Sequence, residues 1–282
     1  MPLTKKKKEG INRVSATVVL IILAAAFGFP FFWMVITSLK PTQEVLIYPP
    51  KILPQVLHLV NYVEAATMIP YFRYLWNTVY IAVVWTSGII FCSTLTAYGF
   101  SRLKWKGRDI FFYIMLATMM VPFQVILIPL FVMYSKIHWV GTFKPLTWPG
   151  FLGFSGAFYI FLMRQFFMTL PKDLEDAAKI DGCNELQVFL RIMLPLVKPA
   201  LAAVVLFCFV AVWNDFLEPL VYINSQDKYT LALGIYNFAA ARYSSWPRLM
   251  ASAIEISLPV IIVFFFVQKT FIQGITLTGI KG

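Results

Sequence analysis

The sequence predicts an all-α integral membrane protein with six transmembrane helices. The first observation is composition: 60% of the 282 residues are apolar and only 13% are charged. A soluble domain carries about 25% charged residues, because its surface must be covered with polar groups. The second observation is that the charged residues lie in short clusters between long apolar runs. Lipid is the solvent that both observations indicate.

The apolar runs define the predicted spans. A bilayer core about 30 Å thick requires about 20 apolar residues in a helix. Runs that meet this requirement are nearly free of Asp, Glu, Lys and Arg, and they occupy residues 14–39, 74–101, 110–135, 145–163, 199–222 and 249–268. The first run is longer than the apolar region of a cleaved signal peptide, so we expect an uncleaved span.

The basic residues predict the orientation. Lys5 to Lys8 and Arg13 precede the first span, so the tail 1–13 is expected in the cytoplasm. Alternation through six spans then places 16 of the 24 Lys and Arg residues inside, including Lys269 and, in the C-terminal tail 273–282, Lys281. This bias follows the positive-inside rule. The net charge of +11 therefore indicates orientation and contact with anionic headgroups rather than nucleic-acid binding.

The sequence contains little that indicates catalysis. The three cysteines form no CxxC pair, and His58 and His138 lie in separate loops, so no metal site is predicted. No HExxH or GxSxG motif occurs, which disfavours a membrane-embedded enzyme; a receptor or scaffold is the other alternative outside transport. No GxxxxGK[ST] phosphate loop occurs either, so we expect no cofactor and no ATP site in this chain.

A long charged connector, residues 170–198, separates the fourth and fifth predicted spans. Its first half predicts a short helix, with Asp173 as the cap and with Glu175 and Asp176 at the positive end of the helix dipole. Gly182 is expected to close the helix in the left-handed conformation. One face of this helix has small residues at its centre and would permit close approach of another surface; it comprises Leu174, Ala177, Ala178 and Asp181.

The second half of the connector predicts another short helix. Asn184 and Gln187 have the spacing of a capping box, and Pro195 and Pro199 mark the end of the helix and the start of the fifth span. Taken alone, the two-helix pattern fits a solvated hairpin on the membrane surface as well as it fits a docking element.

A family resemblance favours the docking element. The residues that carry it are Glu175, Asp176, Ala177 and Ala178, then Asp181 and Gly182, then Ile192, Leu194 and Pro195. This pattern resembles the EAA signature of permease subunits in bacterial ABC importers, with Asp176 in place of the first alanine if Glu175 is aligned with the Glu. The resemblance implies a type I importer permease architecture, and it implies that these nine residues couple the chain to an ATPase.

Further strings resemble the carbohydrate-importing branch of that family. They include Leu39 to Thr42, Pro49-Pro50, Asn61-Tyr62, Ala97 to Phe100 and Trp213-Asn214. The ending is similar to the tail of the second permease of maltose importers. That likeness implies an ATPase contact by the tail residues Gln273, Gly274, Gly279 and Lys281.

The resemblance implies the permease half of an ATP-driven importer in the bacterial inner membrane, with both termini cytoplasmic. Its implied partners are a second permease that completes a heterodimer, an ATPase dimer that binds ATP and Mg, and an extracytoplasmic solute-binding protein. The implied solute is a sugar or oligosaccharide. A non-sugar solute, such as glycerol phosphate or a peptide, is the alternative.

The candidate solute path lies in the last two spans. Trp213, Asn214, Asp215 and Glu218 occupy the outer part of the fifth span, and Glu255 lies in the sixth. An acid inside the membrane costs several kcal/mol unless it faces a cavity or a partner. Asp215 and Glu218 therefore either border the path or meet water at the outer interface. Glu255 either contacts solute or pairs with a polar group of the second permease.

Overall fold

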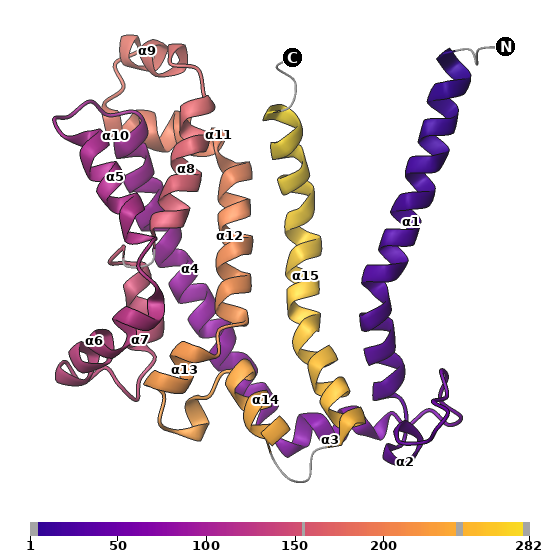
Figure 1. Cartoon of the computed structure of the whole chain (residues 1–282). Coiled ribbons are helices and arrows are strands. Elements are labelled where there is room, and N and C mark those ends of the chain that lie inside the picture. The colour runs from indigo at the N-terminus through magenta and orange to yellow at the C-terminus, as the bar shows by residue number, and fades with distance from the viewer. Residues whose placement is uncertain (1–4, 154–155, 241–244, 279–282) are drawn as a thin grey trace. The chain divides into compact units, whose positions relative to one another are not determined.

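The computed structural model contains helices and turns, and no strand is found among the residues it describes (Figure 1). It describes residues 5–153, 156–240 and 245–278, with side chains for 13–153, 156–239 and 245–268. The chain divides into two compact units. One comprises the residues up to Ile69 together with Asn237–Ser257, and the other comprises Pro70–Tyr236 together with the residues from Leu258 onward.

The first unit contains α1 (Lys5–Ser38), α2 (Thr42–Val45) and α3 (Val60–Met68). Buried Asn61 holds the turn after α1, because its side-chain amide donates to the carbonyls of Ser38 (2.7 Å) and Lys40 (2.8 Å). The hydroxyls of Ser38 and Tyr62 lie 2.7 Å apart. The Asn61-Tyr62 pair is therefore a local structural device that fixes α3 against the end of α1.

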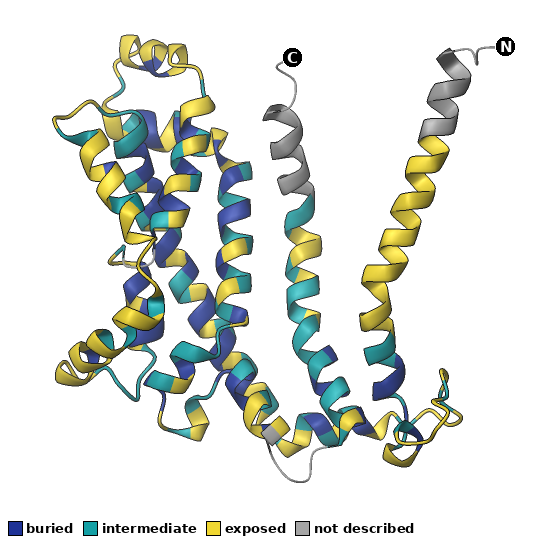
Figure 2. Ribbon diagram, in the orientation of Figure 1, coloured by how far each residue is buried: buried dark blue, intermediate teal, exposed yellow. Residues whose placement is uncertain are grey.

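Helix α1 exposes nearly all of its apolar side chains. Every residue from Arg13 to Phe32 is exposed, which Figure 2 shows as an almost continuous yellow helix. The side chains at these positions include Val, Leu, Ile and Phe with half or more of their surface accessible. Packing within the chain does not account for such an apolar helix, whereas a lipid environment does.

The second unit is built around α4 (Tyr71–Ser101). The helices that follow are α5 (Arg108–Thr118), α6 (Phe123–Lys136), α7 (Lys144–Thr147), α8 (Ala157–Thr169), α9 (Asp173–Ile180), α10 (Glu185–Gln187), α11 (Leu194–Leu196), α12 (Lys198–Trp213), α13 (Leu217–Tyr222) and α14 (Leu231–Ala240). Short 3₁₀ turns, η1 (Trp148–Gly150) and η3 (Gln226–Lys228), and one π-helical segment, η2 (Val188–Met193), lie between them. The long α15 (Trp246–Thr278) begins in the first unit and continues into the second.

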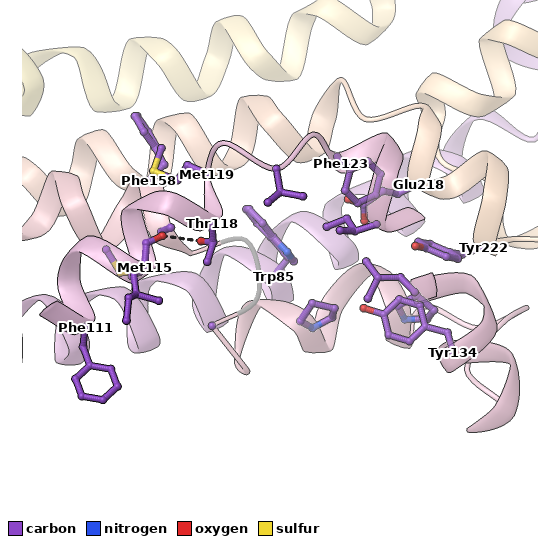
Figure 3. A pocket seen from close by; sticks show the side chains of 18 residues that line it. Trp85, Phe111, Met115, Thr118, Met119, Phe123, Tyr134, Phe158, Glu218 and Tyr222 are labelled. Carbon is purple, nitrogen blue, oxygen red and sulfur yellow. Dashed lines mark hydrogen bonds between the residues drawn. The ribbon is translucent and has the colours of Figure 1, made fainter. Parts of the chain in front are cut away.

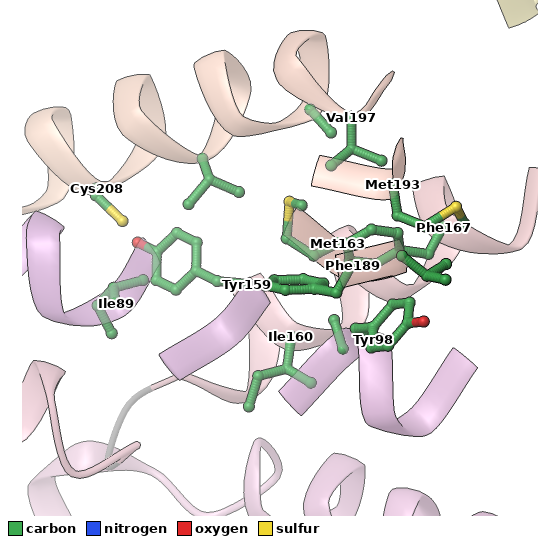
Figure 4. Packing of buried hydrophobic residues seen from close by; sticks show 14 of the residues in the cluster. Ile89, Tyr98, Tyr159, Ile160, Met163, Phe167, Phe189, Met193, Val197 and Cys208 are labelled. Carbon is green, nitrogen blue, oxygen red and sulfur yellow. The ribbon is translucent and has the colours of Figure 1, made fainter. Parts of the chain in front are cut away.

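A single apolar cluster fills the space between α4, α8, α12 and the connector. Met163 and Phe167 of α8 are fully buried, and so are Val204 and Cys208 of α12 (Figure 4). The ring of Tyr98, near the end of α4, lies 5.8 Å from the ring of Phe167 and 5.0 Å from that of Phe189 in the connector. Burial of this kind makes α4, α8 and the connector one packed body.

The opposite end of α4 is held by polar contacts. The amide of Asn77 donates to the carbonyls of Asp227 and Tyr229, at 3.0 Å each. The hydroxyl of Thr78 accepts from the backbone N–H of Leu231 at 2.9 Å. Helix α4 is thus fixed at both ends, with α9 and α10 near one end and α13 near the other (Figure 1).

Three of the six predicted spans contain a break. The range 110–135 is divided into α5 and α6, which meet at 94°. Pro122 has an extended backbone at the start of α6, and a proline disfavours helix at the residue before it. The range 145–163 is divided into α7, η1 and α8, with Pro145 and Pro149 in the short pieces. The range 199–222 breaks between Trp213 and Leu217.

The remaining three ranges are continuous helices. Residues 14–38 lie in α1, with Leu39 in the turn after it, 74–101 lie in α4, and 249–268 lie in α15. Among the described residues, three helices are long and apolar enough to cross a membrane. The number rises to five if α5 with α6 and the connector helix with α12 each form one bent span. The bends place polar backbone inside the apolar region, where it needs partners from the protein itself.

Two glycines set the distance between α4 and the turn η1. A Cβ built on Gly88 would lie 2.7 Å from the backbone N of Phe151, and one built on Gly150 would lie 2.7 Å from the backbone O of Trp85. The two backbones therefore touch where neither residue has a side chain. Small residues at such positions permit close packing of membrane helices.

We predict that Gly88→Ala lowers the free energy of unfolding by about 1–3 kcal/mol, the usual cost of overpacking, because the backbone at Phe151 blocks the new methyl group. Thermal unfolding in detergent measures the effect. Gly99→Ala in the same helix is the matched control, since a Cβ there meets nothing within 4 Å. Equal melting temperatures for the two variants would contradict the close contact.

Candidate functional site: the connector and the acidic cavity

The first helix of the connector, α9, forms as predicted but begins differently. It starts at Asp173, and no side chain caps its N-terminus, so the predicted cap by Asp173 is wrong. Asp173 lies inside the first turn with Glu175 and Asp176, where all three carboxylates suit the positive end of the dipole. Gly182 has φ +85°, so the predicted left-handed elbow is confirmed.

The second half of the connector has the predicted capping box. The side chain of Asn184 accepts from the backbone N–H of Gln187 at 2.9 Å, and the side chain of Gln187 accepts from the backbone N–H of Asn184 at 2.9 Å. The helix then continues from α10 through η2 to α11. π-Helical segments such as η2 are rare overall, and those that occur often lie at functional sites.

The predicted face of α9 is only partly right. Within α9 the buried residues are Glu175 and Ala178, whereas Leu174, Ala177 and the following Asp181 are exposed. The inward face therefore combines a carboxylate with a methyl group. Ala178 lies one turn from both Leu174 and Glu175, so spacing alone does not tell which of these two neighbours shares its buried side.

The nine predicted coupling residues separate into two groups. Those directed into the chain are Glu175, Ala178, Ile192 and Leu194. Those exposed are Asp176, Ala177, Asp181, Gly182 and Pro195. The exposed surface also contains apolar side chains, of which Ile180 is 86% exposed, Leu186 60% and Leu190 49%. The role of all nine in coupling stays a prediction.

The buried carboxylate of Glu175 faces an arginine at the end of α4. Arg102 Nε lies 3.2 Å from Glu175 Oε1, and the two side chains are 3% and 11% exposed. The atoms are close without the alignment of a hydrogen bond. Burial raises the pKa of Glu175 above its ordinary value, and the nearby Arg102 and Lys179 act in the opposite direction. Removing one partner of a buried pair costs about 3–5 kcal/mol, because the other charge is left without compensation.

The same guanidinium also holds the end of α8. Arg102 Nη2 donates to the backbone carbonyls of Phe167 and Leu170, the latter at 2.6 Å. These carbonyls belong to the last turn of α8 and the residue after it, and that of Phe167 also accepts from the backbone N–H of Leu170 at 3.2 Å. Arg102 therefore contacts α8 and α9 while its backbone directly follows α4. Sequence reasoning counted this residue only as a cytoplasmic base.

Arg164 makes the reciprocal contact from α8 to α4. Its Nε donates to the carbonyl of Phe100 at 3.3 Å, and its guanidinium lies 4.0 Å from the centre of the Phe112 ring of α5. Each of the two helices thus supplies an arginine to backbone carbonyls of the other. Positive charge at helix C-termini is also favoured by the dipole.

An exposed ion pair spans the Gly182 elbow. Lys179 Nζ of α9 lies 2.5 Å from Glu185 Oε1 of α10, and the hydroxyl of Tyr98 donates to Glu185 Oε2 at 3.3 Å. The Lys179 and Glu185 side chains are 44% and 51% exposed, so their attraction is worth about 0–1 kcal/mol. The pair joins the two halves of the connector to each other.

The predicted solute-path residues of the fifth span have different surroundings. Trp213 is 1% exposed, and its ring stacks on Phe209 at 5.0 Å, which makes it a core residue. Asn214 is exposed, and its side-chain amide donates to the carbonyl of Val210 at 2.9 Å. Asp215 Oδ1 accepts from the backbone N–H of Glu218 at 3.3 Å. Asn214 and Asp215 therefore stabilise the break between α12 and α13.

Glu218 borders two cavities. One has a volume of about 610 Å³ and lies between α5, α6, α8 and α13, with Trp85, Tyr134 and Tyr222 in its wall (Figure 3). The other has a volume of about 180 Å³ and is also lined by Trp85 and by Asp215. The larger volume is within the range of small-molecule sites, which combine apolar walls with a few polar groups. Of the two acids, Glu218 is the one placed to reach the larger cavity.

The other predicted residues belong to the sequence of α15 and the tail after it. Glu255 is half-buried in the part of α15 that belongs to the first unit. Gln273 and Gly274 fall within α15, in a stretch whose side chains are outside the description. Gly279 and Lys281 lie outside the described residues. The roles assigned to these five stay predictions.

Comparison with known proteins decides the family. Residues 89–277 match the model of the binding-protein-dependent transport system inner membrane component. The chain belongs to this family. It is a membrane-embedded permease subunit of a transport system. The matched region includes the whole connector.

The similarity to individual permeases extends over nearly the entire chain. The arabinooligosaccharides transport system permease protein AraQ of Bacillus subtilis is 33% identical, with 96% of this permease and 97% of AraQ covered. The trehalose/maltose transport system permease protein MalG of Thermococcus litoralis is 30% identical, with 98% and 99% covered. A bacterial ABC transporter for the import of the acidic polysaccharide alginate has a crystal structure similar to this permease. The TM-score is 0.78 at 25% identity, with 96% and 100% covered. The predicted type I importer permease fold is confirmed.

We predict that Asp215→Ala lowers the free energy of unfolding by about 1 kcal/mol, through loss of the contact with the Glu218 N–H. Asp215→Asn keeps the accepting oxygen and is expected to unfold at the wild-type temperature with wild-type uptake. Thermal unfolding and solute uptake measure the two effects. Lost uptake in a stable Asp215→Asn variant would instead assign the carboxylate charge a role in the path.

Proposed function

We propose that this permease is one half of the translocation pathway for a neutral oligosaccharide. A second permease completes the pathway, and an extracytoplasmic binding protein delivers the solute. ATP, with Mg, is bound and hydrolysed by separate ATPase subunits on the cytoplasmic side. The N- and C-termini lie on that same side, as the basic residues at the start of α1 indicate.

The observation that carries this proposal is the construction of α9. The helix is fixed to its own chain by Glu175 and Ala178, while the rest of its surface is free to contact another protein. Ile180 next to the elbow, and Leu186 and Leu190 beyond it, are large apolar side chains that remain exposed. Exposed apolar residues grouped beside charged ones are typical of a protein interface. We assign this surface to the ATPase.

The solute class is supported by the relatives and by the cavity. AraQ is named for arabinooligosaccharides and MalG for trehalose and maltose, all of them sugars without charge. The cavity of about 610 Å³ has aromatic walls and the carboxylate of Glu218, a combination suited to sugar rings and hydroxyls. Alternating access would follow if ATP binding favours one arrangement of α9 over another.

We predict that Gly182→Asp abolishes uptake and stimulated ATP hydrolysis while leaving membrane insertion intact. A Cβ on Gly182 meets nothing within 4 Å, and aspartate tolerates the left-handed conformation better than most residues. A side chain at φ +85° also strains the backbone, so a glycine with the same φ is needed to separate that strain from the effect of the new carboxylate at the docking surface. The measurement is uptake by membranes that contain the full transporter.

The matched control is Gly107→Asp. Gly107 also has φ +85° and lies at the start of α5, and a Cβ built there would meet only the Phe111 ring, at 3.4 Å. Its variant should retain uptake. Wild-type uptake by Gly182→Asp, or an equal loss in both variants, would contradict the assigned surface.

The solute is tested with labelled arabinotriose, maltotriose and a uronate trimer. We expect deletion and complementation of the gene to change uptake of a neutral trimer. Uptake of the uronate trimer alone would contradict the proposed class.

A further inference from the structure

Helix α9 has few contacts that fix its direction. Within α9 only Glu175 and Ala178 are buried. Ala178 offers a methyl group to the apolar cluster, and a contact of that kind has no preferred direction. The Lys179–Glu185 pair is exposed, and Glu185 also accepts from the hydroxyl of Tyr98 in α4 at 3.3 Å. Among the described contacts, the one between Glu175 and Arg102 is therefore the buried, charged contact between α9 and the helical bundle.

Arg102 is bonded to more than α9. Its guanidinium faces the carboxylate of Glu175 on one side and donates to the carbonyls of Phe167 and Leu170 on the other. Its backbone N–H donates to the carbonyl of Tyr98 at 2.9 Å, which ties it to the last turn of α4. A displacement of Glu175 must either break the charge contact or move a group that is bound to α4 and α8 together.

We infer that Arg102 is the positioning residue through which movement of α9 reaches α4 and α8. This inference rests on the proposed docking of α9 on an ATPase. Helix α4 then extends the movement to its other end, where Asn77 and Thr78 hold the segment around Tyr229 and Leu231. Guanidinium suits this role because its planar set of donors binds several oxygens in fixed directions.

The test separates transmission from folding. The double variant Arg102→Met with Glu175→Met removes both buried charges, and such replacements are often neutral or stabilising. In the purified full transporter with its binding protein, we expect a wild-type melting temperature. We also expect the amount of labelled arabinotriose or maltotriose imported per ATP hydrolysed to fall about tenfold, the order of a typical coupling between sites.

Two further variants keep the result decisive. Glu175→Gln preserves shape while removing the charge, and it decides the question if the double variant does not fold. Because buried Arg102 then loses its counter-charge, we expect a lower melting temperature, together with a lower import ratio per ATP in the transporter that folds. Arg108→Gln is the control, because Arg108 forms an ion pair with Asp109 at the start of α5 and does not contact α9. It should retain the wild-type ratio.

The outcomes distinguish this inference from the proposed function. Wild-type import per ATP in a stable double variant, or in Glu175→Gln, would overturn the role of Arg102. If the wild-type transporter neither purifies with an ATPase nor imports a neutral trimer, the proposed function itself is wrong. Arg102→Lys, with native Glu175, keeps the positive charge but not the planar set of donors. An import ratio per ATP between those of the wild type and the double variant would support the need for several directed donors.

Discussion

The constraint on which this fold depends is that backbone polar groups in an apolar surrounding must find partners within the protein. The second unit breaks its helices repeatedly, and each break leaves carbonyl or N–H groups without helical partners. Arginines satisfy them at one end of α4, where Arg102 and Arg164 bond to carbonyls of each other's helices. Amides and carboxylates do so at the other, through Asn77 and Asp215.

In the connector, the arginine that satisfies backbone carbonyls also holds α9. Arg102 satisfies carbonyls at the end of α8, and the same group faces the buried Glu175 of α9. A helix with an otherwise exposed surface is thereby held in one orientation. The exposed side of α9 remains available for another protein. Arg102 is therefore both a structural residue and the residue proposed to transmit the coupling.

Much of this could be predicted from residues that act locally. The left-handed Gly182 and the capping box of Asn184 and Gln187 follow from neighbours in sequence, and the structure has both. The breaks near Pro122 and Pro149 were missed because an uncharged run looks continuous when only hydropathy is considered.

Long-range partners were the part that sequence could not supply. The pairing of Arg102 with Glu175 joins residues 73 positions apart, and no local pattern indicates it. The solute-path role of Trp213 stays a prediction. The packing of its ring against Phe209 could not be predicted, because hydropathy does not tell which side of an apolar helix faces its neighbours. Glu218 and the aromatic wall of its cavity come together only through the bends of α5, α6 and α13.

Helices α1 and α4 differ in which substitutions they tolerate. Its residues from Arg13 to Phe32 are exposed, so their requirement is solubility in lipid rather than a particular shape. Exchange among Val, Leu, Ile and Phe there should be nearly neutral, whereas Gly88 in α4 tolerates not even a methyl group without rearrangement. The two helices are alike in apolar character. Substitutions in α1 are therefore limited by solubility in lipid, whereas those at Gly88 in α4 are limited by contact with the neighbouring backbone.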